Sequence, residues 1–106
     1  GQYKGKEARR QIYDSIAKYA ASLGKDVMID PGKTAVSLRR NKKFANITPA
    51  SKTRIDLGIN LKGHPGTDRL VPEKPGSMCT HKVKLESAKD FDAEVKAWLK
   101  DAYGKA

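Results

Sequence analysis

Residues 54–61 read RIDLGINL, the clearest structural pattern in the chain. The large apolar side chains fall on every second position: Ile55, Leu57, Ile59 and Leu61. Successive side chains of a β-strand point to opposite faces of the sheet, so this period predicts a strand with one buried and one solvated face. We expect the polar face to carry Arg54 and Asp56.

Four further segments show the same period of two. They are residues 27–29, 36–39, 44–48 and 80–85. Residues 30–33 (DPGK) predict a tight turn, because proline presets φ and glycine accepts a positive φ. Residues 40–43 (RNKK) are typical of a hairpin tip, and Pro49 ends the third segment because proline has no N–H for the ladder. Such short connections predict a five-stranded, mainly antiparallel sheet.

Amphipathic helical patterns lie at both ends of the chain. The first covers residues 6–23, and Gly24 is expected to stop it in a left-handed conformation. The second begins near Ser87 and ends at Gly104. Both helices should cover the apolar face of the sheet. The sequence thus predicts one two-layer α+β domain over residues 1–106, with the order α-β-β-β-β-β-α.

The segment 62–78 has no period and is rich in glycine and proline. A connection of this length is either a functional lid or mobile chain. Residues 63–67 (GHPGT) lack the Gly-Lys-Ser/Thr ending of a phosphate-binding loop and have no helix directly behind them, so we interpret them as a flexible connection.

The chain is strongly basic. Its 106 residues contain 22 Lys+Arg and 12 Asp+Glu, a formal net charge of +10. The densest basic run is residues 39–43, whereas residues 86–106 hold 4 basic and 5 acidic side chains. A cationic surface attracts polyanions at long range and binds phosphates by counterion release. The alternative is a solvated basic surface that keeps a small protein soluble.

Composition also bears on the compartment. No stretch is long or apolar enough to cross a membrane, and the first residues lack the apolar core of a signal peptide. The single cysteine, Cys79, excludes an internal disulfide and fits a reducing compartment. We therefore expect a cytoplasmic protein without a membrane partner.

Reactive residue types gather at Cys79, Thr80 and His81. On a strand, Cys79 and His81 would share a face about 7 Å apart, too far for a thiolate–imidazole hydrogen bond. Because Val83 lies on that face too, we expect both to be structural, and no catalytic residue is predicted. The spacing of His64, His81 and Cys79 matches no zinc site, so no metal or cofactor is expected.

Candidate binding residues come from the predicted strands and the hairpin tip. They are Arg39, Arg40, Lys42, Lys43, Phe44, Arg54, Asp56, Thr80 and His81. Guanidinium groups hold carboxylates and phosphates through paired hydrogen bonds, and Phe44 would offer one ring for stacking on a base. The alternative for Arg39 and Arg54 is an ion pair with Asp56.

Several motifs occur in an order that resembles a small bacterial domain family of unknown function. They are residues 34–40, 43–45, 53–61, 78–85 and 97–103. Members often carry this domain at the C-terminus, behind a short helical domain, and some related sequences are labelled predicted transport protein. The resemblance implies a cytoplasmic bacterial protein, and with Gly1 at the start it implies a piece excised from a longer chain. It implies no reaction, and a transport role conflicts with the lack of a segment that could span a bilayer.

Three functions remain open at this point. The leading one is a non-catalytic binding or accessory module whose basic sheet face engages an anionic partner, with nucleic acid as the first candidate. The second is a small ligand-binding or enzymatic pocket under the 62–78 segment, lined by Arg39, Arg54, Asp56, Thr80 and His81. The third is an interaction module whose acidic C-terminal helix docks an adjacent helical domain or a second copy of the chain.

Overall fold

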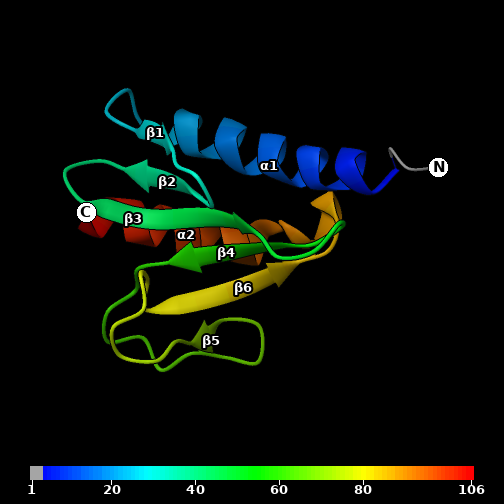
Figure 1. Cartoon of the computed structure of the whole chain (residues 1–106). Coiled ribbons are helices and arrows are strands. Elements are labelled where there is room, and N and C mark those ends of the chain that lie inside the picture. The colour runs from blue at the N-terminus through cyan, green and yellow to red at the C-terminus, as the bar shows by residue number, and fades with distance from the viewer. Residues whose placement is uncertain (1–3) are drawn as a thin grey trace.

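A helix, an antiparallel sheet and a second helix follow one another in the computed structural model, which describes residues 4–106 and only the backbone of residues 4–6 (Figure 1). The elements are α1 (Lys4–Leu23), β1 (Met28–Pro31), β2 (Val36–Arg39), β3 (Lys43–Pro49), β4 (Ile55–Ile59), β5 (Val71–Pro72), β6 (His81–Leu85), the 3-10 helix η1 (Ala88–Asp90) and α2 (Ala93–Lys105). The strands form one sheet in the order β1-β2-β3-β4-β6-β5, with antiparallel neighbours throughout. The predicted α+β class is confirmed.

The sheet has six strands, so the prediction of five is wrong. The additional strand is β5, at the sheet edge next to β6, where Val71 pairs with Lys82 and Pro72 with His81 (Figure 1). Two residues are too few to show a period of two, and Pro72 has no N–H to donate, which confines it to an edge. A strand of this kind leaves no sequence pattern.

The segment 62–78, which contains β5, packs against the rest of the protein. Leu70 is fully buried in the core. The backbone N–H of Leu70 donates to Thr67 Oγ1 at 3.0 Å, and the Arg69 guanidinium lies 2.9 Å from carboxylate oxygens of both Asp92 and Glu94. These contacts are those of a packed connection rather than of a lid.

The core lies between the two helices and one face of the sheet. The alternating residues of β4 are buried as predicted, with Ile55 2% exposed and Leu57 fully buried. The helices complete this core with Ile12, Ile16, Ala20, Val95, Leu99 and Ala102. Fully burying one of the valine, leucine or isoleucine side chains contributes about 1.5–3 kcal/mol. Among the described residues, no helix is both long and apolar enough to cross a membrane.

The helix ends differ in detail from the prediction. α1 ends at Leu23, but φ of Gly24 is not positive; the position needs glycine because a Cβ would overlap the Tyr103 hydroxyl. α2 begins at Ala93, where the Asp92 carboxylate accepts a hydrogen bond from the backbone N–H of Val95. Gly104 lies inside this helix rather than ending it.

Candidate anion-binding site

Arg40 fastens the β2–β3 hairpin to α2. Its Nε donates to Asp26 Oδ2 at 2.8 Å, and its guanidinium lies 4.5 Å from the centroid of the Tyr103 ring. The Tyr103 hydroxyl in turn donates to Asp26 Oδ1 at 2.6 Å. This hydrogen bond, together with the Arg40 guanidinium, lowers the pKa of Asp26, and the same contact raises the pKa of Tyr103. The position of Arg40 is thus explained by structural contacts.

Arg39 and Arg54 lie at opposite ends of the polar face of the sheet. Arg39 pairs with Lys43 at the start of β3, whereas Arg54 precedes Ile55, whose partner Pro49 ends that strand. At roughly 3.3 Å per residue, the two arginines are about 20 Å apart. The structure therefore does not bring them into one pocket.

Acidic side chains accompany these arginines. Arg39 Nε lies 3.9 Å from Asp30 Oδ2, and Arg54 Nε lies 3.2 Å from Asp56 Oδ1. The ion-pair alternative from the sequence is thus observed for Arg54 with Asp56. The Arg39–Asp30 pair is half-exposed and contributes at most about 1 kcal/mol, whereas the paired atoms of Arg54 and Asp56 are buried.

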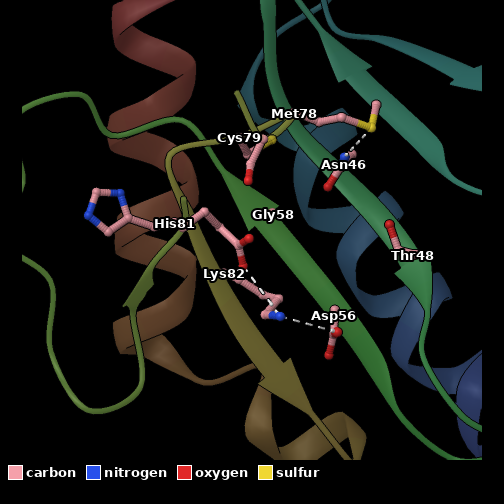
Figure 2. A pocket seen from close by; sticks show the side chains of 10 residues that line it. Asn46, Thr48, Asp56, Gly58, Met78, Cys79, His81 and Lys82 are labelled. Atoms are coloured by element: carbon pink, nitrogen blue, oxygen red, sulfur yellow. Dashed lines mark hydrogen bonds and ion pairs between the residues drawn. The ribbon is translucent and has the colours of Figure 1, made fainter. Parts of the chain in front are cut away.

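A small pocket of about 180 Å³ lies on the polar face beside the segment 73–79 (Figure 2). On its wall, Lys82 Nζ lies 3.9 Å from Asp56 Oδ2 and 3.3 Å from Glu73 Oε1. The charge of Lys82 is therefore balanced by neighbouring carboxylates. The polar face as a whole is less cationic than its lysines and arginines alone suggest.

Cys79 lines this pocket and does not share a face with His81. A Cβ on Gly58 would lie 3.1 Å from Cys79 Sγ, whereas Figure 2 shows the His81 ring pointing away from the other labelled side chains. The predicted shared face is wrong because β6 begins only at His81, so strand alternation does not extend back to Cys79. Burial raises the pKa of the Cys79 thiol to about 11, which keeps it protonated and weakly nucleophilic at neutral pH.

Thr80 and His81 belong to a hydrogen-bonded chain that links the start of β6 to the end of β4 and to the loop that follows β4. His81 is 4% exposed, and its Nε2 lies 3.0 Å from the backbone oxygen of His64. A carbonyl can only accept, so Nε2 carries a proton, while Nδ1 lies 2.7 Å from Thr80 Oγ1, whose hydroxyl donates to the Ile59 backbone oxygen at 3.1 Å. Thr80 Oγ1 also accepts from the backbone N–H of Leu61 at 2.7 Å. Both side chains hold the segment 62–78 in place.

Phe44 sits at a β-bulge. Leu38 pairs with Ala45, but Arg39 pairs with Lys43, which leaves Phe44 as the extra residue. A bulge interrupts strand alternation, and Phe44 and Ala45 are both 0% exposed. The Phe44 ring packs edge-on against Tyr103, with centroids 5.7 Å apart. The expectation that Phe44 offers a ring for stacking is therefore wrong.

Unpaired positive charge gathers where β3 begins and α2 ends, close to the C-terminus in Figure 1. Lys42, Lys43, Lys62 and Lys105 line a hollow of about 340 Å³, here called the lysine hollow, together with Asn60. Lys105 Nζ lies 3.3 Å from Asp101 Oδ2 of the preceding helical turn. Within the described residues, the other three lysines form no ion pair.

The sequence alone indicates only two of the four lysines that line the lysine hollow. Lys42 and Lys43 belong to the predicted hairpin tip, but Lys62 follows β4 and Lys105 ends α2. No local pattern indicates that these two residues join the hairpin. Their meeting follows from the strand order and from the direction of α2.

Comparison with known proteins gives a family. The family model described as Domain of unknown function (DUF5655) matches residues 1–106. The chain belongs to this family. The comparisons of this DUF5655 domain with curated proteins and with solved structures gave no match. The resemblance to a domain family of unknown function is thus confirmed.

Proposed function

We propose that this DUF5655 domain is a non-catalytic binding module that engages an anionic partner, nucleic acid first, through the lysine hollow. One observation carries the proposal: lysines from three separate parts of the chain line the same hollow. Ammonium groups of like charge repel one another, and a bound anion relieves that repulsion.

The arginines on the polar face are less suited to this role. Arg39, Arg40 and Arg54 each have an aspartate within ion-pair distance, so an incoming anion would compete with a partner already in place. Lys42, Lys43 and Lys62 face no such competition from the described residues. Lysine acts toward a phosphate as a mobile point charge, which fits a flexible polyanion.

The mode of binding follows from the absence of a stacking ring at the hollow. Phe44 lines it but is fully buried, so its ring cannot stack on an extruded base. Contact is therefore to the phosphate backbone, which carries no sequence information. Affinity should be similar for unrelated sequences and should fall steeply as salt concentration rises.

Fluorescence anisotropy with labelled single-stranded and duplex DNA and RNA across salt concentrations tests the proposal. The test variant replaces Lys42, Lys43 and Lys62 by Gln, and the control variant replaces Lys52, Lys84 and Lys100 by Gln. Both remove three charges, but the control lysines do not line the hollow. We expect only the test variant to lose about tenfold or more in affinity, with a salt slope shallower by about 2–3 on duplex DNA.

Two results would contradict the proposal. One is a wild-type domain that shows no salt-sensitive binding at low ionic strength. The other is an equal loss in the two triple variants, which would mean that net charge rather than the lysine hollow controls binding. Circular dichroism of both variants establishes that they are folded.

A further inference from the structure

A second hollow lies between α1 and the β1–β2 turn, at the end of β3 that is opposite to the lysine hollow. Its volume is about 350 Å³. The floor is formed by Val36, Ile47 and Ile55: Val36 pairs directly with Ile47, and Ile55 lies diagonally from Ile47 on the same side of the sheet, two residues before Leu57, the β4 partner of Ile47. Ile47 is 1% and Ile55 2% exposed, so little of each side chain reaches solvent.

Cationic side chains surround the mouth of this hollow: Arg9, Arg10 and Lys33. Arg9 Nη1 donates to the backbone oxygen of Ser51 at 3.0 Å, which holds its guanidinium beside the opening. Arg10 Nε lies 3.9 Å from Oδ2 of the exposed Asp14. Among the described residues, this is the one carboxylate that forms an ion pair with the rim. The rim therefore keeps an excess of positive charge.

Lys33 is positioned by a tight turn. The backbone N–H of Gly32 donates to the Ala35 oxygen at 2.9 Å, and a Cβ on Gly32 would lie 2.8 Å from that same oxygen. The turn places Lys33 across the hollow from α1. Tyr13 supplies a half-buried aromatic wall between the two sides.

We propose that this hollow binds a small aromatic carboxylate. The ring would pack against the Tyr13 ring over the small part of the floor that reaches solvent, while the carboxylate meets the cationic rim. The volume lies near the lower end of small-molecule pockets, about 300–1,000 Å³, which fits one or two fused rings. A neutral aromatic ligand would contact only the floor and the Tyr13 ring. A small anion without a ring would contact only the cationic rim.

A methyl-detected NMR titration with three probes tests this inference independently of nucleic-acid binding. The probes are 2-naphthoate, which has ring and charge, 2-naphthalenemethanol, which has the ring alone, and acetate, which has the charge alone. We expect 2-naphthoate to shift the methyl signals of Val36, Ile47 and Ile55, with a Kd at least fivefold below that of the alcohol. Acetate should leave these signals unchanged.

Paired variants show whether the rim provides the charge. Arg10→Gln with Lys33→Gln should weaken 2-naphthoate binding at least fivefold and leave binding of the alcohol unchanged. The control pair, Lys84→Gln with Lys100→Gln, removes the same charge away from the hollow and should change neither. Equal affinities for 2-naphthoate and the alcohol, equal losses in both pairs, or methyl shifts centred elsewhere would overturn the inference.

Discussion

Gly58 illustrates how a missing side chain positions a polar neighbour. It lies opposite Asn46 in the β3–β4 ladder, and a Cβ there would overlap the Asn46 amide oxygen. The Asn46 side chain is buried and its Nδ2 lies 3.6 Å from Met78 Sδ. Because Gly58 carries no side chain, the amide can lie flat over β4 beside Cys79.

Replacing Gly58 by alanine tests this close approach. We expect Gly58→Ala to lower the free energy of unfolding by about 1–3 kcal/mol, because the amide must move within a packed surface. Gly104→Ala is the control: nothing lies within 4 Å of a Cβ built there. At this helical position, alanine should be neutral or stabilising by up to about 1 kcal/mol. Urea denaturation measures both, and an unchanged midpoint for Gly58→Ala would contradict the packing.

Tyr103 and Asp26 form the second residue-scale test. The Tyr103 hydroxyl is the largest cause that lowers the pKa of Asp26. A lowered folded-state pKa contributes stability that is present above the unfolded value of 3.8 and is lost as pH falls through the folded value. We expect Tyr103→Phe to raise the pKa of Asp26 in an NMR titration and to weaken the acid dependence of stability below about pH 4.

A matched tyrosine controls for general effects of this substitution. Tyr13 lies on α1, away from Asp26, and its hydroxyl makes no hydrogen bond within residues 7–106. Tyr13→Phe should therefore leave the pKa of Asp26 unchanged. If Tyr103→Phe left it equally unchanged, the hydrogen bond would not control the charge of Asp26.

At the scale of elements, Arg69 connects the segment around β5 to the start of α2. Besides its two carboxylate partners, the guanidinium donates to the backbone oxygen of Asp90 at 2.8 Å. The pKa of Asp92 is lowered chiefly by the Val95 N–H and further by Arg69. Asp92 thus caps α2 through the Val95 N–H and holds the segment around β5 through its ion pair with Arg69.

Removing this connection should loosen the loop without unfolding the sheet. We expect Arg69→Gln to increase hydrogen exchange at the backbone amides of Thr67 and Leu70, which are hydrogen-bonded within this segment. Amides of β3 and β4 should keep their protection, because exposed ion pairs contribute at most about 1 kcal/mol to global stability. Uniform loss of protection across the sheet would show instead that Arg69 supports the whole fold.

The elements themselves were predictable to different degrees. β4 could be predicted because its large apolar residues alternate without interruption and all face the core, although on the other face Asp56 is only partly exposed and Gly58 is buried. β5 could not, because two residues with a proline show no period and become a strand only through their pairing with β6. The bulge at Phe44 likewise depends on the register with β2, which single-strand alternation does not reveal.

For the whole molecule, the net charge is +10, and the proposed anion site depends on which lysines and arginines have no carboxylate partner. The sequence marks the hairpin lysines, but it cannot show that Asp30 and Asp56 balance Arg39 and Arg54. Nor can it show that Lys62 and Lys105 join the hairpin, since they are separated from it along the chain. Those relations depend on strand order and on which end of the sheet α2 reaches.

The most direct test of the proposed function is a backbone-amide NMR titration with a short single-stranded oligonucleotide at low salt. We expect the largest shifts at Lys42, Lys43, Lys62 and Lys105, and we expect them to diminish as salt is added. Shifts centred on Lys82 and Lys84 of the polar face, or no shift at low salt, would contradict the assignment of the lysine hollow as the anion-binding site.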